Sequence, residues 1–166
     1  RKNMKILSMK TTIFLGAMLS LLVCLMFTGC SNSETNSTSR GLTDFAHIEE
    51  EYLATIDSLN WPDGITLPDK LEDEDTGASF QVGYGETRAS YLWEYSWMKE
   101  WLDTYNTDPE RAEKALEELE KAFDMPYMGI DRCDDATRNY LRENIDKAKL
   151  GDPSGFTESI RANYAN

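Results

Sequence analysis

Cysteine, histidine and basic residues are scarce in this sequence. Its 166 residues include three Cys and one His, and 17 Lys and Arg stand against 30 Asp and Glu. Four of the basic residues and none of the acidic ones precede Cys30, so the chain from Cys30 onward has 13 basic residues and a formal charge of −17. Because nucleic-acid binding depends on Lys and Arg that neutralise phosphates, this charge argues against a nucleic-acid partner.

The few cysteines exclude two ways of stabilising a small domain. Cys24 lies inside an apolar stretch near the start of the chain, Cys30 ends that stretch, and Cys133 is the third. A domain that begins after Cys30 therefore has a single free thiol, which allows neither an internal disulfide nor a paired-Cys zinc site. We expect a hydrophobic core to stabilise it.

Enzyme motifs are missing as well. The sequence has no G-x-S-x-G, H-E-x-x-H or P-loop pattern. The one histidine, His47, is predicted to face away from the apolar side of a helix, so no ordinary base is available to activate a Ser or Cys nucleophile. We predict a protein without enzymatic activity, cofactor or metal.

The first thirty residues have the layout of a secretory signal. Lys5 and Lys10 precede an apolar run at residues 13–27, and the small residues Thr28 and Gly29 follow it. The sequence Phe27-Thr28-Gly29-Cys30 resembles the lipobox of bacterial lipoproteins, with Phe27 where Leu is usual. The resemblance implies cleavage before Cys30 by signal peptidase II, a diacylglyceryl group on the Cys30 sulfur and often an acylated N-terminus. An uncleaved membrane anchor and ordinary secretion are the alternatives.

With a lipoprotein signal at its start, the chain is predicted to have three parts. Residues 1–29 are the predicted signal peptide, and residues 30–41 are the lipidated Cys30 with a flexible tether rich in Ser, Thr and Asn. Residues 42–166 are a single acidic domain on the extracytoplasmic face of the cell membrane. The predicted partners are the membrane, through the lipid on Cys30, and an unidentified protein of the cell envelope.

The domain is predicted to be mostly α-helical, a small irregular bundle of four to five helices. Apolar residues recur at helical spacing from Asp44 to Asn60, with Thr43 or Asp44 as the N-cap. Asp108 followed by Pro109 begins another helix, and Asp134 or Asp135 caps a third. A short last helix opens at Asp152-Pro153.

Residues 61–85 are the least regular part of the domain. Residues 65–68 and 80–84 are candidates for short extended segments. Between them, residues 71–77 are acidic but lack the spacing of a calcium-binding EF-hand, which favours a solvated loop over a cation site. A long irregular loop therefore precedes the most aromatic stretch of the chain.

That stretch, residues 84–105, holds three of the four Trp and four of the eight Tyr. On a helix, Trp93, Trp97 and Trp101 form one stripe, and a neighbouring stripe consists of Tyr91, Tyr95, Met98, Leu102 and Tyr105. Aromatic residues at this spacing are typical of a core. If they flank a groove instead, Trp93, Glu94, Trp97 and Trp101 form a surface for a ligand or partner.

Glu94 falls among these aromatic side chains, which is unusual for a carboxylate. The residues allow three interpretations: a buried acid paired with Tyr, Trp or backbone donors or with an arginine (Arg88, Arg132, Arg138 or Arg161); a side chain that reaches water; or a functional carboxylate with a raised pKa in an aromatic pocket. Two functions remain open. One is a non-enzymatic protein-interaction module, and the alternative is a receptor for a small ligand or glycan.

Overall fold

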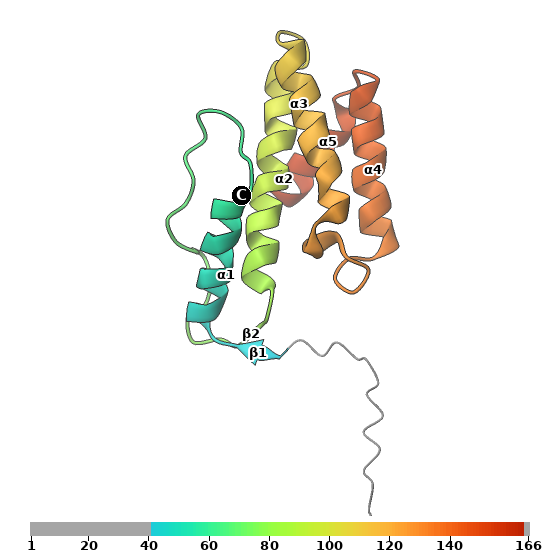
Figure 1. Ribbon diagram of the computed structural model, residues 1–166. Helices are drawn as coiled ribbons and strands as arrows, with labels where there is room; N and C mark the ends of the chain where they lie inside the picture. Colours follow the sequence, from blue (N-terminus) through green and yellow to red (C-terminus); the bar gives the residue numbers. More distant parts are fainter. Residues whose placement is uncertain (1–40, 165–166) are drawn as a thin grey trace, which may run out of the picture. The chain divides into compact units, whose positions relative to one another are not determined.

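The computed structural model describes residues 41–164. The predicted signal peptide, Cys30 and the tether up to residue 40 lie outside the described residues. In chain order the elements are β1 (Leu42–Thr43), α1 (Phe45–Ser58), β2 (Phe80–Gln81), α2 (Tyr84–Thr104), α3 (Pro109–Glu120), the 3₁₀ turns η1 (Lys121–Asp124) and η2 (Pro126–Met128), α4 (Asp135–Lys149) and α5 (Ser154–Asn163). The domain is mostly α-helical, as predicted (Figure 1).

Aspartates begin three of the helices. Asp44, Asp108 and Asp134 each precede a helix and accept a hydrogen bond from a backbone N–H three residues on, at 3.0, 3.2 and 2.7 Å. These bonds satisfy amide groups that lack partners in the first turn. The predicted caps are confirmed, with Asp44 rather than Thr43 at α1 and Asp134 rather than Asp135 at α4.

The aromatic helix α2 is capped from another helix. Gly83 precedes it with φ +90°, a conformation that favours glycine, and has no side chain with which to cap. The Glu51 carboxylate of α1 accepts hydrogen bonds from the N–H groups of Gly83, at 2.8 and 2.9 Å, and Gly85, at 3.2 Å. A carboxylate is favourable at this positive end of a helix, so α1 fixes where α2 begins.

Helix α2 is the centre of the domain. It packs against α1 on one side and α3 on the other, and also contacts α5 and η2 (Figure 1). At one crossing, Gly85 lies so close to α1 that a Cβ atom there would be 1.8 Å from the carbonyl oxygen of Ile48. Only glycine allows the two backbones this approach.

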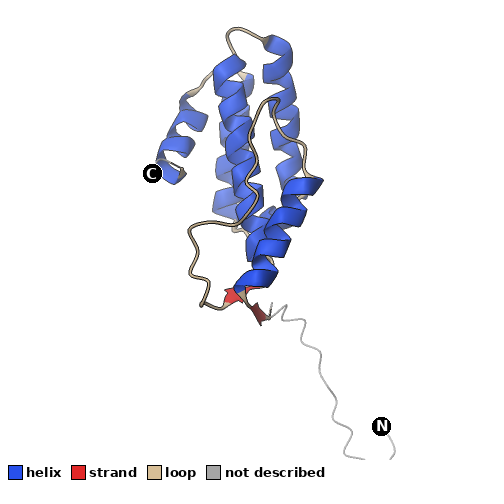
Figure 2. Cartoon of the chain, turned by 90° about the vertical axis from the view of Figure 1, so that its left-hand side faces the viewer, coloured by secondary structure: helices blue, strands red, loops and turns tan. Residues whose placement is uncertain are grey.

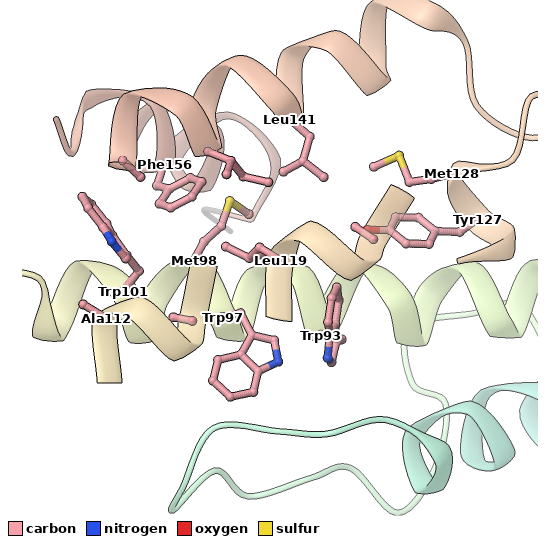
Figure 3. Close-up of a cluster of buried hydrophobic side chains, with 14 residues drawn as sticks. Trp93, Trp97, Met98, Trp101, Ala112, Leu119, Tyr127, Met128, Leu141 and Phe156 are labelled. Atoms are coloured by element: carbon pink, nitrogen blue, oxygen red, sulfur yellow. The ribbon is translucent and has the colours of Figure 1, made fainter. Parts of the chain in front are cut away.

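Two hydrophobic clusters hold the domain together. The larger contains Trp93, Trp97 and Trp101 of α2 with side chains from α3, η2, α4 and α5, including Leu119, Leu141 and Phe156 (Figure 3). The smaller joins α1 to α2 and to the long connection; its buried members are Ile48, Tyr52, Ile56, Leu71, Phe80 and Ala89. The two stripes predicted on α2 therefore differ in burial. The three tryptophans are fully buried, whereas Tyr95, Leu102 and Tyr105 of the other stripe are only partly buried.

The long connection between α1 and β2 is irregular, as predicted (Figure 2). Two details differ from the sequence analysis. Residues 65–68 form no strand, and the extended segment expected at 80–84 shortens to Phe80–Gln81, which pairs antiparallel with Leu42–Thr43. The physical reason is the cap described above, because Glu51 binds the N–H groups of Gly83 and Gly85 and the chain is helical from Tyr84 onward. Within residues 41–164, no helix has the length and apolar character needed to cross a bilayer.

Candidate functional site

The three tryptophans do not form the predicted ligand or partner surface. Trp93, Trp97 and Trp101 are only 1–2 % exposed. The indole N–H groups of Trp93 and Trp97 both donate to the carbonyl of Asn60, at 2.8 and 3.1 Å, which joins the end of α1 to α2. Because their rings fill the core and these polar atoms have partners, they are structural residues.

Glu94 is buried beside them, and its partner is a tyrosine. The side chain is 7 % exposed, and Oε2 accepts a hydrogen bond from the Tyr127 hydroxyl at 2.8 Å. Within residues 41–164, this is the one hydrogen bond to the Glu94 carboxylate. Of the predicted partners, the tyrosine hydroxyl is confirmed. The prediction of an arginine partner is wrong. Arg88 pairs with Glu74, Arg132 with Glu86 and Arg138 with Asp135, and Arg161 is exposed.

Burial changes the acidity of this carboxyl group. Because the charged form is poorly solvated, the pKa of Glu94 is raised from 4.5 to about 7, and the hydrogen bond from Tyr127 opposes the shift. Burial and the neighbouring Glu94 raise the pKa of Tyr127 in turn, so its hydroxyl stays a donor. Near neutral pH the Glu94 carboxyl can therefore be either charged or neutral.

Glu94 lies in the wall of a cleft with a volume of about 800 Å³. Helix α2 supplies one side, and residues of α4 and of the chain in and just after α5 supply the other. Tyrosine is the most frequent residue type in the lining; the residues considered below are Arg88, Tyr91, Glu94, Tyr95, Tyr140 and Tyr164. A volume in this range is typical of small-molecule sites, which combine apolar walls with a few polar groups.

The tyrosines are held by one another and by burial. The rings of Tyr95 and Tyr164 lie 5.0 Å apart, and those of Tyr91 and Tyr127 lie 5.6 Å apart, edge to face. Tyr91 and Tyr140 remain 41 % and 40 % exposed and are accessible to an incoming molecule. Burial and then Glu94 raise the pKa of Tyr164, which keeps its hydroxyl protonated. The cleft thus presents aromatic faces and phenol donors around one carboxyl group.

Other candidate residues have structural explanations. His47 is exposed on α1 and lies 3.2 Å from Glu51. Burial raises the pKa of the Cys133 thiol although the nearby Arg138 opposes the shift, so the reactive thiolate form is disfavoured. In residues 41–164, no group of three or more His, Cys, Asp or Glu side chains is arranged to hold a metal ion.

The acidic loop at residues 71–77 contacts the rest of the domain. Glu74 accepts a hydrogen bond from the Tyr84 hydroxyl at 2.8 Å and pairs with Arg88 at 3.4 Å. Leu71 is buried, and its N–H donates to Glu49 at 3.2 Å. These contacts fasten the loop to α1 and α2.

Helical spacing places Glu94 among aromatic residues, and an aromatic pocket is one of the three interpretations, but the residues across the cleft were not predicted. The lining of the cleft comes from segments far apart in sequence, and Tyr140 and Tyr164 carry no local signal of a site. Tyr127 follows Pro126 in a short turn, where the sequence indicates only the end of a helix. Comparisons with known proteins found no matching family model, no similar curated protein and no similar solved structure.

Proposed function

We propose that this protein is a lipid-anchored, extracytoplasmic receptor that binds a small ligand in the cleft between α2, α4 and α5. The observation that carries the proposal is the tyrosine-lined cleft of about 800 Å³ with the buried Glu94 carboxyl in its wall. A buried ionisable group in a concave site with several aromatic residues is a recognised feature of binding and active sites. The proposed activity is binding without chemistry.

The cleft favours a small ligand over a docked protein. Of the large apolar side chains in residues 41–164, Ile130 and Leu150 are the most exposed, at 88 % each. Ile130 lies in the turn before α4 and Leu150 directly follows its last residue, so the two belong to opposite ends of α4. Isolated apolar residues of this kind are normal on a soluble surface and do not form a docking patch.

The anchor rests on the sequence of the leader. The apolar run at 13–27 leads directly into Thr28-Gly29-Cys30. Cleavage there would leave a lipid-modified Cys30 at the N-terminus, and two or more acyl chains give stable membrane attachment. The acidic domain would then be held to the membrane by lipid rather than by adsorption to anionic headgroups, which its negative charge disfavours.

Two experiments test the two halves of the proposal. Mass spectrometry of the mature protein should show a lipid-modified N-terminal Cys30, and Cys30→Ala should lose acylation. An unmodified Cys30 or cleavage at another bond contradicts the anchor.

For binding, an NMR screen of small polar and aromatic fragments against the full chain in non-ionic detergent should give perturbations that cluster at Tyr91, Tyr140 and Tyr164. A screen that yields no cleft binder contradicts the receptor function.

A further inference from the structure

The chemistry of the cleft identifies the kind of ligand it is built to hold. We propose that the ligand carries a protonated amine and that the Glu94 carboxylate is its counter-ion. This inference rests on the proposed receptor function and specifies the substrate class of the same site.

The Glu94 carboxylate has unfilled hydrogen-bonding capacity. Oε2 is bound by the Tyr127 hydroxyl at 2.8 Å, whereas Oε1 has no hydrogen-bond donor among the described residues. A carboxylate has room for several donors and is costly to bury without a compensating charge. The side chain is buried yet lies in the cleft wall, so a molecule in the cleft can supply both the missing donor and the missing charge.

Among residues 41–164, no basic side chain is paired with the Glu94 carboxylate. Arg88 is the one basic residue that lines the cleft, and it pairs with Glu74 at 3.4 Å. It precedes Glu94 by six residues on α2, which places it about 9 Å away along the helix axis. Glu94 is therefore a single unbalanced acid, and an anionic ligand group beside it would be repelled.

Aromatic rings line the cleft around this carboxylate. The rings of Tyr91, Tyr95 and Tyr164 belong to the cleft together with Glu94. The face of a tyrosine ring attracts cations, and aromatic walls around an acid are a common arrangement for recognising ammonium groups. The negative charge of the whole domain also draws cations toward it. The carboxylate, the tyrosine rings and the negative charge of the domain thus all favour a positively charged ligand.

Three matched probes test the inference: n-butylammonium, 1-butanol and butanoate, which share a four-carbon chain and differ in charge. NMR titrations use the full chain in non-ionic detergent at pH 8, where Glu94 is ionised. We expect saturable shifts of Tyr91 and Tyr164 with n-butylammonium and much weaker or no shifts with the other two. Glu94→Gln keeps an oxygen that can accept from Tyr127 and should weaken n-butylammonium binding by about 10- to 100-fold, as expected for a charge-assisted hydrogen bond.

Glu113→Gln is the matched control, because Glu113 is exposed on α3 and its substitution makes the same change of charge. It should leave binding unchanged. Equal binding of the ammonium and the alcohol, or equal affinity in the Glu94→Gln variant with far-UV circular dichroism showing a folded protein, overturns the inference. If the fragment screen nevertheless finds neutral ligands in the cleft, the receptor function stands and only the inference that the ligand carries a protonated amine is wrong.

Proton release gives an independent readout. At pH 6 much of Glu94 is protonated because its pKa is about 7, so an incoming ammonium should displace up to one proton. The other ionisable groups in or beside the cleft are Arg88, Tyr91, Tyr95, Tyr127, Cys133, Tyr140 and Tyr164. Burial raises the pKa of Tyr91, Tyr127, Tyr164 and Cys133, so none of these four supplies the proton. Calorimetry in buffers of different ionisation enthalpy should show this release for the wild type and not for Glu94→Gln. Binding without proton uptake or release in the wild type overturns the counter-ion role.

Discussion

The Tyr127 hydroxyl lies 2.8 Å from Glu94 Oε2, and this bond connects the turn between α3 and α4 to the middle of α2. The tyrosine is 2 % exposed, so its ring belongs to the core while its hydroxyl meets the wall of the cleft. The bond therefore couples the packing of the domain to the carboxyl group on which the proposed binding depends.

Tyr127→Phe should separate these two roles. The ring remains in the core, but Glu94 loses its donor, so we expect a loss of about 1–3 kcal/mol in the free energy of unfolding. Because that bond stabilises the charged carboxylate, the pKa of Glu94 should also rise above about 7. Chemical denaturation at pH 6 and pH 8 checks both effects, and the loss should be larger at pH 8. An equal loss at the two pH values would contradict the assignment of the donor.

Gly85→Ala should be strongly destabilising. The added Cβ would lie 1.8 Å from the Ile48 carbonyl oxygen, so α1 and α2 would have to move apart. We expect a loss of about 2–3 kcal/mol, the range for overpacking a tight contact. Gly41→Ala is the control, because a Cβ there meets nothing within 4 Å. Thermal unfolding of the two variants measures the difference, and equal melting temperatures would show that the helices do not cross so closely.

Glu51→Gln should weaken the start of α2. The carboxylate caps the N–H groups of Gly83 and Gly85, and the neutral amide loses its attraction to the helix N-terminus. We expect a cost of about 1 kcal/mol, with faster hydrogen exchange in the first turn of α2. Glu50→Gln removes the same charge from an exposed neighbour and should have little effect. Identical exchange in both variants would contradict the cap.

The stability that protonated Glu94 contributes to the folded protein should fall as pH rises from about 4.5 to about 7. The pKa of Glu94 is 4.5 before folding and about 7 afterwards, so the folded state favours the protonated form. The contribution of Glu94 to the free energy of unfolding is complete below pH 4.5 and is lost as pH rises through 7. The change in that free energy is about 3 kcal/mol. The Glu94→Gln variant lacks this change, so the difference between the two unfolding free energies should vary with pH. A difference that stays constant from pH 4.5 to 8 would mean that Glu94 is solvated.

The helices could be predicted because their signals are local. Asp44, Asp108 and Asp134 stand directly before apolar residues at helical spacing, and each forms the cap that its position indicates. The burial of Trp97 follows from the same periodicity. The extended segment expected at 80–84 is shorter than predicted because a distant residue, Glu51 of α1, caps the start of α2 at Gly83 and Gly85.

The site could be predicted only in part, for a similar reason. Spacing along α2 places Glu94 among aromatic residues, but its partner Tyr127 is 33 positions away and lies on a different element. The cleft depends on how α4 and α5 pack against α2, which brings Tyr140 and Tyr164 to the same wall. No single stretch of sequence contains that information.

The most direct test of Glu94 as the counter-ion of the ligand is an NMR titration of its side-chain carboxyl carbon, assigned by its absence in Glu94→Gln. The account predicts a midpoint near pH 7 in the free protein, and a lower midpoint when n-butylammonium is present, because a bound cation stabilises the carboxylate. A midpoint near the ordinary value of 4.5 that does not respond to n-butylammonium would contradict both the buried carboxyl and its role as counter-ion.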